Sequence, residues 1–163
     1  MAALATGCTP SLDWREVRPA GTAVTVLLPC KPAASTRTVS LVGQTMPLSM
    51  LACKADGWTW ALVSADVVDP ARVGPALLAL REGTRANVQG RLVSAAPSAV
   101  RGATPHEAQA AVALLGHKPD GTSVSARMVV FSHGTKVFQA VVMGPQEPGP
   151  AGETFFDSLR VAP

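Results

Sequence analysis

Alternation of apolar and polar residues predicts strands over most of this chain. Apolar or β-branched residues recur at every second position in a series of segments, which is the period of a strand with one buried face. The segments expected to form strands are 22–28, 36–42, 46–54, 58–63, 107–115, 123–131 and 136–143, with one short strand within 91–100. Turn signals such as Asp56-Gly57 and Pro119-Asp120-Gly121 separate several of them, so neighbouring strands should pair as antiparallel hairpins.

The segment 107–115 carries two conflicting signals. Its alanines favour a helix, for which Thr104 would be the N-cap and Pro105 the first residue. The turn at 119–121 and the clear strands after it favour a three-stranded meander instead. We predict a strand here, with a helix as the alternative.

Two helices are expected. Asp69-Pro70 is a helix-start signal, and we expect a short turn there followed by a helix over about 75–87, because Pro75 cannot lie deep inside a helix. A closing helix is expected over 151–161. The pattern therefore predicts an α+β fold with an antiparallel sheet of about six to seven strands.

Length and composition exclude several protein classes. The chain has 163 residues, which suggests a single domain, expected over 21–163. Pro10, Pro19 and Gly21 indicate a leader or tether over 1–20. Charged residues make up 15% of the chain, against about 25% in an average globular protein, so a disordered or coiled-coil chain is excluded. No apolar run approaches the ~18 residues that a membrane-spanning helix needs.

The charge distribution argues against nucleic-acid binding. The net charge is +3, and the basic residues are scattered rather than gathered in a stripe. Aromatic residues make up 4% of the chain and there is no Tyr, so platforms for stacking bases are scarce. We expect no nucleic-acid partner.

The first of the three cysteines, Cys8, follows a small residue in Thr6-Gly7-Cys8. Bacterial lipoprotein signal peptidase accepts such a site, and the Cys then becomes the lipidated first residue. Met1–Leu4 supplies neither the basic nor the apolar part of an export signal, so this hypothesis expects a translation start further upstream. The alternative is that Cys8 is an ordinary residue near the N-terminus.

The other two cysteines, Cys30 and Cys53, form an even pair at the edges of predicted strands. In an oxidising compartment they can form a disulfide. By closing a loop in the unfolded chain, this bond would raise the free energy of unfolding by about 3 kcal/mol. The alternative is a pair of reduced thiols that pack as small apolar side chains. Both the disulfide and a lipid at Cys8 would place the domain outside the cytosol.

Catalytic and metal-binding motifs are weak. There is no phosphate-binding loop, nucleophile elbow or paired CxxC motif. His106-Glu107 begins like the zinc-protease motif HExxH, but Ala110 replaces the second histidine. A weak metal site near His106, Glu107 and His133 is the remaining candidate, while His117 should lie roughly 30 Å from His133 at the other end of a strand. We expect no catalytic residue and no cofactor.

Four short stretches carry a resemblance to a known group of proteins. They are Thr25–Pro32 (TVLLPCKP), Pro119-Asp120-Gly121 with Val137–Ala140 (VFQA), and Phe155–Arg160 (FFDSLR). Together they resemble small uncharacterised exported proteins of proteobacteria, often lipoproteins, which in turn resemble the PsbP-like fold. The resemblance implies an α/β/α sandwich around an antiparallel sheet and a location in the cell envelope. It implies no catalytic residues, and fold alone does not transfer a function.

The leading functional hypothesis is a non-enzymatic domain of the periplasm that binds a protein partner or a small ligand. Its contact with the membrane would be a lipid on Cys8. One alternative is an envelope hydrolase or metal-dependent enzyme with a site near His106, Glu107 and His133. Another is a cytoplasmic protein-interaction domain.

Overall fold

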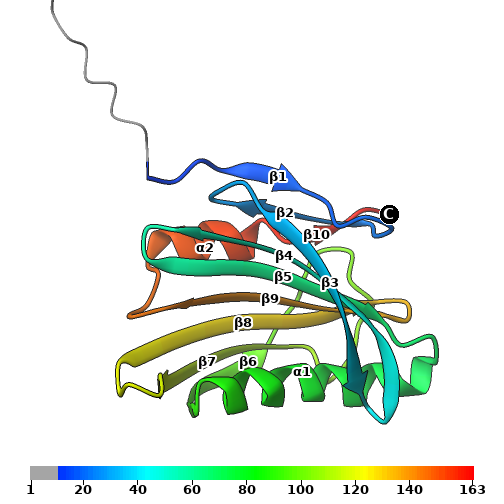
Figure 1. Cartoon of the computed structure of the whole chain (residues 1–163). Helices are drawn as coiled ribbons and strands as arrows, with labels where there is room; N and C mark the ends of the chain where they lie inside the picture. Colours follow the sequence, from blue (N-terminus) through cyan, green and yellow to red (C-terminus); the bar gives the residue numbers. More distant parts are fainter. Residues whose placement is uncertain (1–10) are drawn as a thin grey trace, which may run out of the picture.

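A seven-stranded antiparallel sheet forms the centre of the fold (Figure 1). The structure, a computed structural model, describes residues 11–163. The strands are β3 (Ala33–Leu41), β4 (Gln44–Ala55), β5 (Trp58–Asp66), β6 (Arg91–Pro97), β7 (Ala110–His117), β8 (Ser123–His133) and β9 (Lys136–Gly144), in the order β3-β4-β5-β9-β8-β7-β6. The α+β class and the antiparallel sheet are confirmed. The strand predicted over 107–115 is confirmed from Ala110 onward, since β7 pairs with both β6 and β8, whereas 107–109 precede the strand in a turn.

Helices and a small second sheet cover the two faces of this sheet. On one face lies α1 (Val73–Asn87), which follows a single 3-10 turn, η1 (Pro70–Arg72). On the other face lie α2 (Pro150–Asp157) and a three-stranded sheet of β1 (Arg15–Val17), β2 (Val24–Leu28) and β10 (Arg160–Val161), as Figure 1 shows. Within residues 11–163, no helix is long and apolar enough to cross a membrane.

Both predicted helices differ from the observed ones in their bounds. The helix α1 begins at Val73 rather than at 75, and Pro75 is tolerated because the first amides of a helix have no partner inside it. The predicted helix over 151–161 is wrong after Asp157. There the Ser158 hydroxyl donates to the Phe155 carbonyl and accepts the Leu27 amide, and the chain then pairs with β2 as β10.

The segment before the first predicted strand also contributes to the fold. Arg15–Val17 pairs with β2, and the Trp14 ring meets the edge of the Trp60 ring at a centroid distance of 6.0 Å. A backbone amide of Asp13 donates to the Pro29 carbonyl at 2.8 Å. The described part of the expected tether is therefore attached to the body from Asp13 onward.

The sheet has an apolar core on each side. The period of two places Trp60 and Leu62 in the core under α2 and the small sheet, and Ala61 and Val63 in the core under α1. Trp58, Trp60 and Leu62 share one face, as alternate positions of the strand predicted over 58–63 should. The strands β8 and β9 lie well inside the sheet and bury residues on both faces, which explains their nearly continuous apolar sequences.

Asp66, at the end of β5, gives the fold a dependence on pH. The Thr135 hydroxyl donates to its carboxylate at 2.7 Å and the Val68 amide donates at 2.9 Å. These two hydrogen bonds, with the charge of Lys136, hold the pKa of Asp66 below its ordinary value of 3.8. Because the folded pKa is lowered, the associated stability is present above pH 3.8 and is lost as the pH falls through the folded value.

We expect Thr135→Val to raise the pKa of Asp66, since the hydrogen bond from Thr135 is the largest cause of its shift. A carboxyl-detected NMR titration of both proteins measures this pKa directly. The free energy of unfolding of the variant should also depend less on pH in the acid range. An unchanged Asp66 titration in Thr135→Val would contradict this account.

Candidate functional site

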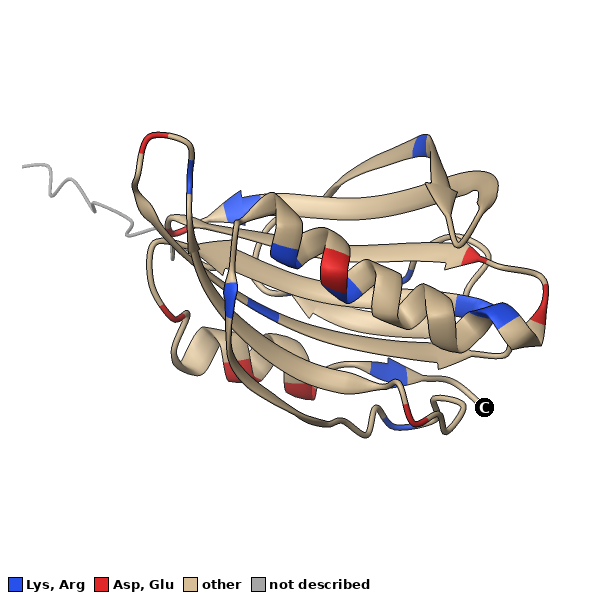
Figure 2. Cartoon of the chain, turned by 90° about the horizontal axis from the view of Figure 1, so that it is seen from below, with Lys and Arg blue, Asp and Glu red and all other residues tan. Residues whose placement is uncertain are grey.

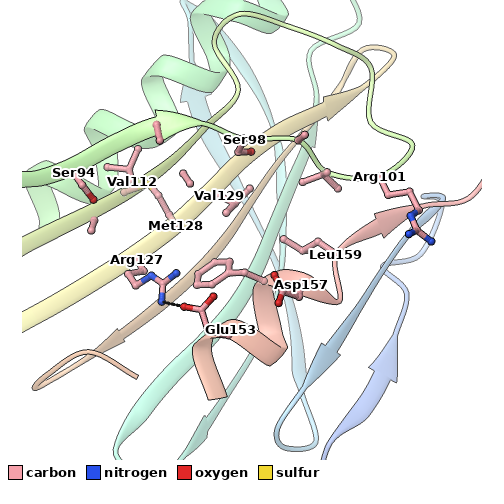
Figure 3. A pocket seen from close by; sticks show the side chains of 16 residues that line it. Ser94, Ser98, Arg101, Val112, Arg127, Met128, Val129, Glu153, Asp157 and Leu159 are labelled. Atoms are coloured by element: carbon pink, nitrogen blue, oxygen red, sulfur yellow. Dashed lines mark hydrogen bonds and ion pairs between the residues drawn. The ribbon is translucent and has the colours of Figure 1, made fainter. Parts of the chain in front are cut away.

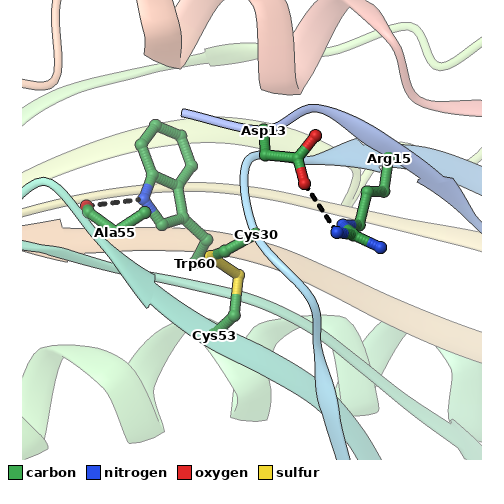
Figure 4. The surroundings of a disulfide bond; sticks show 6 residues. All are labelled: Asp13, Arg15, Cys30, Cys53, Ala55 and Trp60. Atoms are coloured by element: carbon green, nitrogen blue, oxygen red, sulfur yellow. Dashed lines mark hydrogen bonds and ion pairs between the residues drawn. A yellow bond between two sulfur atoms is a disulfide. The ribbon is translucent and has the colours of Figure 1, made fainter. Parts of the chain in front are cut away.

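The disulfide between Cys30 and Cys53 is present, as Figure 4 shows, with the two Cα atoms 5.9 Å apart. Cys30 lies just after β2 in the small sheet, while Cys53 lies in β4 of the main sheet opposite Trp60. The bond therefore links the two layers beside the core that contains Trp60. Cys8 lies outside the described residues, so its lipidation stays a prediction.

The histidines singled out from the sequence do not form a common site. His106 Nδ1 accepts the Ala108 amide at 3.0 Å, and a Cβ atom on Gly74 would lie 2.8 Å from the His106 ring. The His106 ring is thus packed against the first turn of α1, while Glu107 and His133 are exposed. In the described part of the chain, no three His, Cys, Asp or Glu side chains are grouped closely enough to hold a metal ion.

A polar cleft of about 520 Å³ lies between α2 and the strands β6 to β8 (Figure 3). Its floor is made of small side chains, namely Ser94, Ala96, Ala111 and Ala113. On one wall the Arg127 guanidinium lies 5.1 Å from the centre of the Phe156 ring and pairs with Glu153 at 2.9 Å. Glu147 approaches the same guanidinium at 3.9 Å, so acidic side chains of the chain itself already satisfy this cation.

An apolar groove of about 470 Å³ lies on the opposite side of the sheet, between α1 and the curved strands β3, β4, β5 and β9. We call it the α1 groove. Its apolar lining includes Leu48, Met50, Ala61, Val63, Leu80 and Met143. Arg37, Ser35 and Asn87 are among its polar lining residues. A volume of this size lies within the range of about 300–1,000 Å³ that is typical of small-molecule sites.

One buried polar side chain, Gln139 of β9, lines the α1 groove. It is 5% exposed, and its Nε2 donates to the Leu80 carbonyl at 3.1 Å and to the Thr84 hydroxyl at 2.8 Å. Because the Leu80 carbonyl can only accept, the amide nitrogen of Gln139 must face it. The Gln139 Oε1 then accepts no hydrogen bond from any residue of 11–163, which leaves an acceptor for a ligand.

The α1 groove was not predicted from the sequence. Two signals pointed to it: Gln139 is a polar residue inside an otherwise apolar strand, and Gly83 interrupts a helix. Neither signal shows that five elements enclose a common space. No known family model matches the chain, and a comparison with curated proteins gives no significant match.

Proposed function

We propose that this chain is a non-enzymatic binding domain that works outside the cytosol, in the cell envelope. The observation that carries the proposal is the Cys30–Cys53 disulfide. Glutathione and thioredoxin keep cytosolic thiols reduced, whereas disulfides persist in exported proteins. A chain of this size has a core large enough to fold without covalent links, so the compartment is the simpler reason for the bond.

The same proposal includes a lipid anchor and a fold family. The pattern Thr6-Gly7-Cys8 supports lipidation at Cys8, close enough to the folded body to hold it at a membrane surface. A seven-stranded antiparallel sheet with helices on both faces is the architecture expected of a PsbP-like domain. The fold resemblance supports an envelope location but does not itself assign a ligand.

The binding role draws support from two of the concave surfaces, the polar cleft beside α2 and the α1 groove. The cleft beside α2 is polar and is lined by Arg101 and by Arg127, which pairs with Glu153, whereas the α1 groove has an apolar lining and, on Gln139 Oε1, an acceptor that no residue of 11–163 satisfies. The competing idea of an enzyme site has less support, because the His106 ring is engaged in packing and none of His106, Glu107 and His133 lines either surface.

Intact-mass analysis of the protein purified from its own membranes tests the proposal. We expect a mass two units below that of the reduced chain, from one disulfide, and a diacylglyceryl increment on Cys8. Cys8→Ser should release the protein from the membrane fraction, because a lipid supplies most of the membrane affinity of such a domain. An unmodified chain with reduced thiols in the cytosolic fraction would overturn the proposal.

A further inference from the structure

The helix α1 contains two glycines, and only one of them is explained by packing. At Gly74 a Cβ atom would lie 2.8 Å from the His106 ring, so no larger residue fits without displacing it. At Gly83 a Cβ atom would meet nothing within 4 Å. Glycine is among the poorest helix formers, so Gly83 lowers helix stability where no neighbour in the chain requires it.

The open space beside Gly83 belongs to the α1 groove. Gly83 lines the groove together with Ala79, Leu80, Thr84 and Asn87, which recur on one face of the helix. Local rules of sequence preference are most often broken at functional positions. Gly83 is itself exposed, so the space beside it is open to solvent, and together with the unpartnered Gln139 Oε1 in the same groove it leaves both room and an acceptor for a ligand.

The groove also defines the chemistry of this ligand. Its lining is mostly apolar, so the ligand needs an apolar body. Arg37 is the one charged residue among those that line it, and no ion pair within residues 11–163 involves Arg37. An anionic head would complement that guanidinium. Covering Gln139 Oε1 with hydrocarbon would leave a buried acceptor unpaired, so the ligand should also carry a hydrogen-bond donor.

We propose that the α1 groove binds a hydroxylated fatty acid, an acyl chain with one carboxylate head and one hydroxyl group. The carboxylate pairs with Arg37, the chain lies against the apolar lining beside Gly83, and the hydroxyl donates to Gln139 Oε1. Charge complementarity and the volume of the groove favour this single-chain amphiphile over a protein segment. The inference rests on the binding role proposed above and names its ligand.

Variants at Gly83 test the occupancy of the groove without damaging the fold. Leucine and alanine are both better helix formers than glycine, and neither meets a neighbour at Cβ. We expect Gly83→Ala to raise the Tm by about 2–4 °C and to change the affinity little. Gly83→Leu should keep a Tm at or above that of the native protein but weaken binding by at least about tenfold, because its side chain fills the ligand's space.

The probes are dodecanoate, its β-hydroxy and ω-hydroxy derivatives, and dodecanol, titrated by calorimetry into the oxidised full chain. At least one hydroxy acid should bind about tenfold more tightly than dodecanoate, because it satisfies Gln139 Oε1. Arg37→Gln should weaken binding of the acids by about tenfold and leave dodecanol unaffected. Equal affinities for hydroxylated and plain acids, or equal losses for acid and alcohol in Arg37→Gln, would overturn the assignment.

Absence of saturable binding for all four probes, or binding that Gly83→Leu leaves unchanged, would overturn the inference as a whole. These results are separate from the thiol and lipid measurements. A protein that proves oxidised and membrane-bound but does not bind the acids would reject the groove ligand and retain the proposed envelope location.

Discussion

Replacing Cys30 and Cys53 together by alanine should lower the free energy of unfolding by about 3 kcal/mol. The two cysteines are 23 residues apart, and the bond restricts the unfolded chain by closing the loop between them. In the folded state it joins the end of β2 to β4, so the small sheet and the main sheet can no longer separate independently. Urea denaturation of the oxidised protein and of the double variant measures the difference.

The control for this prediction is the protein that keeps Cys30 and Cys53, measured with and without a reductant. Reduction should shift its urea midpoint toward that of the double variant, while the double variant should not respond. Cys8→Ser in all samples prevents thiol exchange with the third cysteine. A double variant as stable as the oxidised protein would show that the bond does not stabilise this fold.

Trp60→Ala should destabilise the fold by about 3–5 kcal/mol. The side chain is 0% exposed and fills the core under α2 and the small sheet. Its ring meets the edges of Trp14 at 6.0 Å and Phe155 at 5.5 Å, so its removal leaves a cavity between three parts of the chain. Chemical denaturation followed by circular dichroism gives the change in unfolding free energy.

Trp58→Ala is the matched control for Trp60→Ala. Trp58 lies two residues earlier in the same strand and points to the same face, but it is only half-buried. Removing the Trp58 side chain should therefore lower the free energy of unfolding by clearly less than removing that of Trp60. Trp60→Phe keeps an aromatic ring in the core and should remain folded if Trp60→Ala does not. Equal decreases in the free energy of unfolding for Trp58→Ala and Trp60→Ala would contradict the assignment of Trp60 to the centre of this core.

Much of the sheet was predictable because its strands are joined by local signals. Asp56 and Gly57 both adopt a positive φ, of 54° and 87°, in the turn that the Asp-Gly pair predicts between β4 and β5. Asp69 accepts the Ala71 amide as an N-cap at the start of η1, as its position before Pro70 indicates. In these places the residues that specify the structure are neighbours in the sequence.

The pairings between distant segments were not predictable from such signals. Nothing local indicates that β9 inserts beside β5, or that Arg160 and Val161 pair with β2 instead of extending α2. The α1 groove is a feature of the same kind, because Gly83 and Gln139 are 56 positions apart (139 − 83) and meet only in the folded chain. His106 shows the reverse case, since a residue type suited to metal binding is instead packed against Gly74.

The charged residues illustrate why charge alone said little about function. Figure 2 shows that acidic and basic residues are scattered along α1, the loops and the strands, and that neither sign is gathered in one element. Three of the six ion pairs formed by residues 11–163 join two exposed side chains, where they contribute little to stability. Arg37 matters in our account for its position in an apolar groove and not for the net charge of the chain.

The most direct test of the central claim is a count of free thiols on the protein inside growing cells. Cells are quenched in acid, denatured, and treated with a maleimide that adds a resolvable mass to each thiol. The chain contains three cysteines. An exported, lipidated and disulfide-bonded domain predicts no added tag without reductant and two tags after reduction, from Cys30 and Cys53. Three tags without reductant would contradict the account.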